Sequence, residues 1–182
     1  MSLGRGGRQA KPAVPRQPES ADDAYEEAVR RLARQPQSRA MLEGRLRQAG
    51  YAGEAIAAAL DRAQGAGYLS DREFAESLVR RRGGIRGSAM IAQELRASGI
   101  DEATAEPALA GLDREAEFEN AVKVGRKVLG GRRFSEGQAL LAYLGPKLAR
   151  RGFAGGVVYR ACRLLAAEWQ AEGLFDTDLE QN

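Results

Sequence analysis

The chain has 182 residues, a formal net charge of +3 at pH 7, one cysteine and no histidine. These counts exclude the commonest general base, the usual catalytic triads, histidine-ligated metal sites, a thiolate metal site and an internal disulfide. Aromatic residues make up only 6 %, and the abundance of alanine, leucine, arginine and glutamate favours helices over strands. We expect an all-α, cytoplasmic, monomeric protein that is not an enzyme and uses no cofactor and no metal.

The two ends of the chain differ from its middle. Residues 1–20 hold three prolines, three glycines and four basic residues against Glu19, a composition that predicts a disordered basic tail. Residues 171–182 have acidic but no basic side chains, and we expect an acidic tail there. The longest apolar runs, such as AIAAAL at 55–60, are far shorter than the ~20 residues that span a bilayer, so no membrane contact is expected.

A six-letter phrase occurs three times, as LRQAGY, LRASGI and LARRGF. Each copy has a leucine four residues before a glycine, and an apolar residue follows the glycine. The copies begin 49 and then 53 residues apart, which indicates a repeat of roughly fifty residues. The leucines and glycines are Leu46 and Gly50, Leu95 and Gly99, and Leu148 and Gly152.

Within each repeat, apolar residues recur at the three- and four-residue spacing of helix faces. The stripes of the first repeat are Tyr25, Ala28, Val29 and Leu32; Met41, Leu42, Leu46 and Ala49; and Ile56, Ala59, Leu60 and Ala63. The sequence therefore predicts three tandem three-helix repeats of helix-turn-helix-like build, at 21–66, 67–114 and 115–170.

Glycine residues mark the ends of several of these predicted helices. The residue just past a helix often adopts a left-handed conformation that favours glycine, so the glycine of each phrase predicts a helix end, after which the apolar residue folds back onto that helix. In GYLSDREF, Gly67 ends a helix, Ser70 and Glu73 form a capping box, and Leu69 and Phe74 form a hydrophobic staple. A second capping box is predicted at Ser135 and Gln138.

Two prolines bear on the predicted helices. Pro107 is tolerable if its helix begins near Ala103 or Thr104, because the first backbone N–H groups of a helix have no partner. The Gly–Pro pair at 145–146 lies farther inside, and we expect a kink or interruption there before Leu148.

Basic residues are the candidate binding groups. Between Glu117 and Arg163 there are ten basic residues and three acidic ones, which suits an anionic partner. The alternative is that these residues only stabilise helix C-termini, by about 0.3–1 kcal/mol each. The candidates for contact with a partner protein or DNA are Arg80, Arg81, Arg82, Arg86, Lys123, Arg126, Lys127, Lys147, Arg150 and Arg151.

The middle repeat resembles the RecX family of small bacterial regulators that bind the RecA recombinase. The third copy of the phrase, LARRGF, is similar to the family's C-terminal signature, and the resemblance covers about residues 22–167. One departure is GSAM at 87–90, where the family usually carries a proline and basic residues; a basic contact there is weakened in this chain. The matching residues are Gly67, Tyr68, Leu69, Asp71, Phe74, Ala75, Arg80, Arg81, Arg82, Ile91, Glu94, Leu95, Gly99 and Ile100.

The resemblance implies three modules in an elongated curved array that lies in the groove of a RecA filament on single-stranded DNA. It implies binding without catalysis, with inhibition of ATP hydrolysis, strand exchange and coprotease activity, and it leaves contact with the DNA itself possible through the basic faces. Two other functions stay open: a direct DNA-binding protein of helix-turn-helix type, and a helical-repeat scaffold for another protein.

Overall fold

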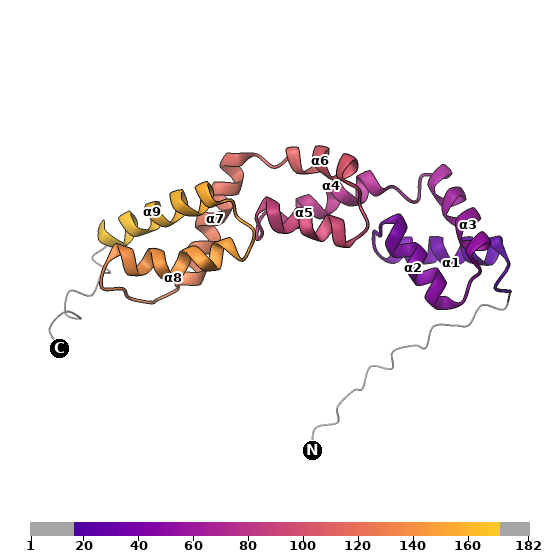
Figure 1. Cartoon of the computed structure of the whole chain (residues 1–182), viewed down its shortest axis with the longest axis horizontal. Helices are drawn as coiled ribbons and strands as arrows, with labels where there is room; N and C mark the ends of the chain where they lie inside the picture. The colour runs from indigo at the N-terminus through magenta and orange to yellow at the C-terminus, as the bar shows by residue number, and fades with distance from the viewer. Residues whose placement is uncertain (1–16, 172–182) are drawn as a thin grey trace, which may run out of the picture. The chain divides into compact units, whose positions relative to one another are not determined.

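The computed structural model describes residues 17–171, which form nine α-helices and no β-strand (Figure 1). These residues belong to two compact units, one ending at Asp71 and the other beginning at Arg72. The predicted all-α fold of three tandem three-helix repeats is confirmed, and the repeats consist of α1–α3, α4–α6 and α7–α9. Within the described part of the chain, no helix is long and apolar enough to cross a membrane.

The first unit contains one repeat and the start of α4. Its helices pack around a core in which Leu42, Leu46 and Leu60 are almost fully buried, and Leu69 closes that core after the third helix. The helices are α1 (Ala21–Arg34), α2 (Arg39–Ala49) and α3 (Gly53–Gly65).

The second unit contains the other two repeats. The middle repeat buries apolar side chains that include Phe74, Ile91 and Leu95. In the third repeat, a larger core forms around Leu140, Leu144 and Leu165. The helices are α4 (Asp71–Arg82), α5 (Ser88–Ala97), α6 (Glu102–Ala110), α7 (Arg114–Leu129), α8 (Gly137–Ala149) and α9 (Gly155–Ala171).

The glycines of the repeated phrase end helices as predicted. Gly50, Gly99 and Gly152 have φ values of 97°, 76° and 84°, the left-handed region in which a side chain is strained. In each copy the N–H of the following apolar residue donates back to the carbonyl of the phrase leucine; from Tyr51 to Leu46 the distance is 3.2 Å. Gly67 also has a positive φ, of 76°. The phrase is therefore a helix stop in all three repeats.

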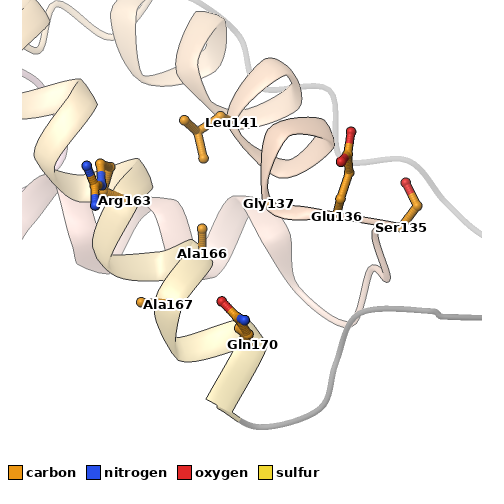
Figure 2. A pocket seen from close by; sticks show the side chains of 8 residues that line it. All are labelled: Ser135, Glu136, Gly137, Leu141, Arg163, Ala166, Ala167 and Gln170. Carbon is orange, nitrogen blue, oxygen red and sulfur yellow. The ribbon is translucent and has the colours of Figure 1, made fainter.

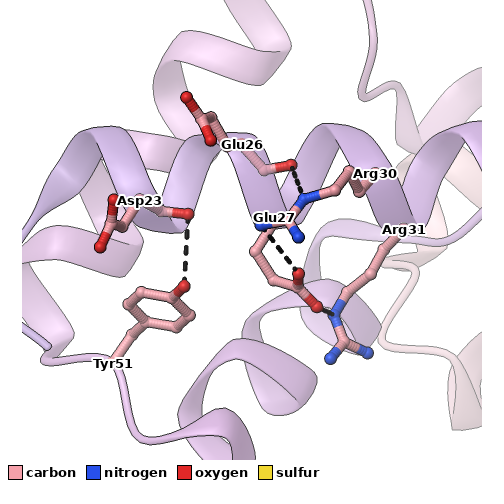
Figure 3. Close-up of polar contacts among 6 residues, drawn as sticks. All are labelled: Asp23, Glu26, Glu27, Arg30, Arg31 and Tyr51. Atoms are coloured by element: carbon pink, nitrogen blue, oxygen red, sulfur yellow. Dashed lines mark hydrogen bonds and ion pairs between the residues drawn. The ribbon is translucent and has the colours of Figure 1, made fainter. Parts of the chain in front are cut away.

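Tyr51, which follows the first of these glycines, ties the end of α2 to α1 (Figure 3). Its hydroxyl donates to the Asp23 carbonyl at 3.3 Å. Burial raises the pKa of Tyr51 above its ordinary value of 10.0, and the carboxylates of Glu27 and Asp23 raise it further, against the opposing effect of Arg30 and Arg31. The contact shows why the apolar position of the phrase holds a tyrosine here: its ring packs beside the core while its hydroxyl finds a backbone acceptor.

The helix starts are partly as predicted. α4 begins at Asp71, which makes Ser70 the residue before the helix and Glu73 its third residue, the positions of the predicted capping box. The second predicted capping box is wrong, because α8 begins at Gly137 after an extended Glu136 whose side chain makes no capping hydrogen bond. Gln138 is thus the second helical residue, too early for the reciprocal bond of a capping box.

Both prolines lie inside helices. α8 runs without interruption through the Gly–Pro pair, so the expected interruption before Leu148 is wrong. Gly145 lacks the Cβ that would clash with the proline ring, and burial of Leu140, Leu144 and Leu148, at about 1.5–3 kcal/mol each, exceeds the cost of about 3 kcal/mol for an internal proline.

α6 starts earlier than predicted. Asp101 caps it by accepting a hydrogen bond from the Thr104 N–H at 2.7 Å, so the helix begins at Glu102 and Pro107 is its sixth residue. This bond also lowers the pKa of the Asp101 carboxyl.

The predicted tails fall largely outside the described residues, namely at 1–16 and 172–182. Residues 17–20 of the predicted basic tail are, however, part of the first unit. Ser20 caps α1 by accepting from the Asp23 N–H at 3.2 Å, and the Pro18 carbonyl accepts from the Ala52 N–H at 2.9 Å. The unit therefore includes a short segment before residue 21, because that segment satisfies backbone groups of two helices.

The two repeats of the second unit are joined through their backbones. The Gly87 N–H donates to the Arg151 carbonyl at 2.9 Å, and the Ala89 N–H donates to the Gly152 carbonyl at 3.2 Å. The Asn120 side chain adds a bond to the Gly83 carbonyl at 3.1 Å. These contacts connect the start of α5 and the turn before it to the α8–α9 turn and to α7.

A carboxylate meets the first backbone N–H of the middle helix in two repeats. Asp71, at the start of α4, accepts a hydrogen bond from the Arg39 N–H of α2 at 2.7 Å. Glu117, near the start of α7, accepts one from the Ser88 N–H of α5 at 2.9 Å. Such bonds satisfy an otherwise unpaired amide and place negative charge at the positive end of the helix dipole.

Candidate partner-binding surface

The structure divides the predicted binding residues by whether a carboxylate neutralises them. Paired charges contribute little to attraction of an anionic partner, whereas unpaired cations keep their full field. Five of the ten predicted residues form an ion pair within 4.0 Å. They are Arg80 with Glu76, Arg82 and Arg86 with Glu94, Lys123 with Glu119, and Arg126 with Glu168.

Two arginines, one at the end of α4 and one in the turn after it, form ion pairs that stabilise the fold. Arg82 and Arg86 each place a guanidinium nitrogen 3.0 Å from a carboxylate oxygen of Glu94, one residue before Leu95 on α5. The shared carboxylate is only 24 % exposed. These pairs hold the α4–α5 turn against α5, and they leave Arg81 as the exposed member of the basic run with no ion pair to a described residue.

Arg126 of α7 is similarly engaged across its repeat. Two of its guanidinium nitrogens approach the carboxylate of Glu168 on α9, at 2.7 and 3.3 Å. The pair fixes α7 against α9, and neighbouring Lys127 stays exposed without an ion pair to a described carboxylate.

The unpaired cations gather on α8 and at its two ends. Lys147, Arg150 and Arg151 lie in its last turn and the turn after it, and none has an ion pair with a described carboxylate. Arg132 and Arg133, just before α8, are exposed and equally unpaired. They were not among the predicted residues, although the run GGRRF at 130–134, with two adjacent arginines and no acid, was a sequence signal for them.

An aromatic ring lies among these cations. The Lys147 ammonium lies 3.5 Å from the centroid of the Tyr143 ring, and the Arg132 guanidinium carbon lies 5.2 Å from it. The Phe134 ring stands 5.5 Å away, centroid to centroid. Cation–π attraction of about 0.5–1 kcal/mol at exposed sites holds both cations beside the ring of Tyr143, in the middle of α8.

The Gly87–Arg151 bond brings two of the predicted groups together. Because the N–H of Gly87 donates to the Arg151 carbonyl, the backbone of Arg86 lies beside that of Arg151, although 65 residues separate them in sequence. Lys123, Arg126 and Lys127, by contrast, lie along α7. We name the set of Arg132, Arg133, Lys147, Arg150 and Arg151 the α8 basic surface.

Comparison with known proteins supports the family resemblance. Residues 24–62 match the family model of the first three-helix domain of RecX, and residues 70–109 match that of the second. The chain is 36 % identical over 174 residues to the regulatory protein RecX of Thermobifida fusca, covering 92 % of this chain and 91 % of that protein. It is also 36 % identical to RecX of Mycobacterium leprae, covering 85 % and 93 %.

Solved structures show the same fold. The crystal structure of RecX from Lactobacillus salivarius superposes with a TM-score of 0.70 at 21 % identity, covering 80 % of this chain and 96 % of that one. A second RecX crystal structure gives a TM-score of 0.69 at 22 % identity, covering 78 % and 72 %. With the helix order, the repeated helix stops and the relatives in agreement, this chain belongs to the RecX family of regulatory proteins.

Proposed function

We propose that this protein regulates the RecA recombinase in the cytoplasm by binding along the RecA filament on single-stranded DNA. Bound there as a monomer, it suppresses ATP hydrolysis, strand exchange and coprotease activity without catalysing a reaction. The observation that carries the proposal is membership of the RecX family over nearly the whole chain. The repeated architecture and the unpaired cations of the α8 basic surface support it.

The mechanism follows from repetition. Three repeats in one chain offer more than one contact surface, and a filament presents the same protomer surface again and again. Once one repeat is bound, its neighbour binds as if at high local concentration, and such linkage commonly raises affinity by about 10²–10⁴. Weak contacts are thus sufficient on a filament and insufficient on a free RecA subunit.

The α8 basic surface is the part of the protein we propose for the anionic partner. Its cations are not neutralised by described carboxylates, so approach of an acidic protein surface or of phosphates does not require an internal ion pair to break. Arg81 and Lys127 are unpaired too and extend the set to α4 and α7. Arg82, Arg86 and Arg126 contribute by holding helices in place.

The deciding measurement is RecA-dependent ATP hydrolysis on single-stranded DNA with this protein present at substoichiometric amounts. We expect the rate to fall, with binding to preformed filaments observed in parallel by sedimentation. An unchanged rate together with no filament binding would contradict the proposal.

The site is tested by charge reversal. Lys147→Glu, Arg150→Glu and Arg151→Glu, combined, are expected to weaken filament binding by tenfold or more, on the order of 1.4 kcal/mol. The matched control reverses three exposed arginines outside the predicted set, Arg34, Arg96 and Arg114, with the same change in net charge. Equal weakening by both triple variants would show a general charge effect and remove the α8 basic surface from the site.

A second candidate function is binding of DNA without RecA, which the unpaired cations and the aromatic ring on α8 favour because phosphates attract lysine and arginine and bases stack on aromatic rings. Its signature is affinity for DNA alone that falls steeply with salt. Tight, sequence-selective duplex binding without RecA would favour it over the filament proposal.

A further inference from the structure

One helix start in the third repeat differs from its counterparts. The first N–H groups of α2 and α5, from Arg39 and Ser88, each donate to a carboxylate of the helix that follows the repeat. The corresponding group of α8 is the N–H of Gly137. Its N-cap residue, Glu136, supplies no side-chain hydrogen bond, and no described carboxylate bonds to it.

A cleft of about 450 Å³ lies where that carboxylate would be. Figure 2 shows the start of α8 on one side of it and a stretch of α9 on the other. Its walls offer an apolar area, the positive end of the α8 dipole and a guanidinium, which together suit an apolar side chain followed closely by a carboxylate. The lining residues are Ser135, Glu136, Gly137, Leu141, Arg163, Ala166, Ala167 and Gln170.

In the first repeat, the carboxylate is delivered by a short exit sequence after the third helix. GYLSD, at 67–71, turns at Gly67, buries Leu69 in the core of the repeat and places Asp71 on the α2 N-terminus. After α6 the chain reads GLDREAE, which leads to Glu117. After α9 it reads GLFDTD, at 173–178, with the same order of glycine, apolar residues and carboxylate.

Spacings along the chain agree with this correspondence. Gly173 lies 25 residues after Leu148, whereas Gly67 lies 21 residues after Leu46, four residues or about one helical turn more. α8 begins 11 residues before Leu148, whereas α2 begins seven residues before Leu46, also four residues more. In the third repeat, the helix start and the exit sequence are therefore both about one turn farther from the leucine of the repeated phrase.

We propose that residues 173–178 of this chain dock in the cleft. Phe175 packs against Leu141 and Ala166, and the carboxylate of Asp176 or Asp178 accepts the hydrogen bond of the Gly137 N–H. These docking residues lie beyond the described part of the chain, and the tether is short. Gln170 lines the cleft, and the five residues from there to Phe175 span at most about 17 Å, enough to turn back across it.

Docking would do for the third repeat what α4 and α7 do for the repeats before them. Repeat proteins need a polar cap on the last exposed core edge, and this segment supplies apolar side chains for that edge together with a carboxylate for the α8 N-terminus. It also offsets the charge of Arg163 in the cleft. The surface left for an anionic partner is then the α8 basic surface, none of whose residues lines the cleft.

Hydrogen exchange of the full-length protein tests the proposal. In Phe175→Ala and in the double variant Asp176→Asn/Asp178→Asn, amides 137–141 are expected to exchange about fivefold faster. That factor corresponds to the loss of about one hydrogen bond. The control is Glu172→Gln/Glu180→Gln, which removes two charges from the same segment outside the docking carboxylates. The single tryptophan, Trp169, is buried and directly precedes Gln170 in the sequence. Its fluorescence is therefore expected to change when the segment leaves the cleft.

The outcomes are distinct. Faster exchange in both docking variants, with the control unchanged, supports the proposal. No change in either docking variant overturns it, as does equal acceleration in the control, which would indicate a general charge effect. Protection that rises with protein concentration would also overturn it, because the occupant would then be a second copy of the chain. RecA binding is not the readout, so the result stands apart from the proposed function.

Discussion

Gly87 lies so close to Gly152 that a Cβ added to Gly87 would stand 2.2 Å from the Gly152 carbonyl oxygen. The reverse substitution meets a similar obstacle, since a Cβ on Gly152 would stand 2.4 Å from the Met90 nitrogen. Two backbones can approach this closely only where both residues lack side chains. The helix stop of the third repeat is thus also the point at which that repeat joins the middle one.

Gly87→Ala is expected to destabilise the second unit by about 1–3 kcal/mol, because the methyl group forces the two backbones apart and weakens the hydrogen bonds from Gly87 to Arg151 and from Ala89 to Gly152. Urea unfolding followed by circular dichroism measures the change. Gly84→Ala is the matched control, since a Cβ there meets no atom within 4 Å. Equal stability of the two variants would show that the close contact is not needed.

Glu117 is 8 % exposed and its carboxylate accepts the Ser88 N–H. Glu117→Ala is expected to cost about 1–3 kcal/mol, because the first amide of α5 loses its partner, whereas Glu119→Ala removes an exposed side chain of α7 and is expected to cost less than about 1 kcal/mol. Glu117→Gln keeps an acceptor oxygen and is expected to recover part of the loss. Thermal unfolding compares the three variants, and no difference between Glu117→Ala and Glu119→Ala would contradict the assignment.

Gly125 lies in the middle of α7, and a Cβ there would be 2.5 Å from a terminal carbon of Leu165. The leucine is fully buried, so Gly125→Ala is expected to lose about 1 kcal/mol, as overpacking outweighs the gain in helix propensity. Gly44→Ala in α2 meets nothing within 4 Å and is expected to gain about 0.5–1 kcal/mol. Denaturant midpoints of both variants are the measurement, and stabilisation by Gly125→Ala would show that Leu165 moves without cost.

The raised pKa of Tyr51 predicts a pH dependence. The folded protein holds the hydroxyl proton to higher pH than the unfolded chain does, so this contribution to stability is complete below pH 10.0 and is lost as the pH rises through the folded-state value. Tyr51→Phe has no titrating hydroxyl at this position. Its free energy of unfolding, measured by chemical denaturation, is therefore expected to fall less between pH 9 and 11 than that of the parent protein. At neutral pH it is expected to be about 1 kcal/mol less stable, through loss of the bond to Asp23. Parallel pH profiles would contradict the prediction.

The repeat, the helix stops and most helix positions followed from the sequence. Apolar residues three and four apart define helix faces, and glycine at the left-handed turn is a local steric requirement; both are properties of short stretches. The predictions of helix starts and interruptions were wrong where packing between distant residues outweighed a local sequence preference. The leucines of α8 override the Gly–Pro pair, and the extended Glu136 displaces the capping box predicted at Ser135.

The binding residues show the same division. Their basic character was evident from the sequence, but which of them are neutralised was not, since the partner of Arg126 lies 42 residues away on α9 and the two partners of Glu94 lie on the preceding turn and helix. Neighbouring residues along the chain are enough to specify three repeats of three helices and the glycine that ends each middle helix. The unpaired cations and the junction of the last two repeats depend instead on the folded structure, because residues distant in sequence supply the ion-pair partners and the backbone contacts.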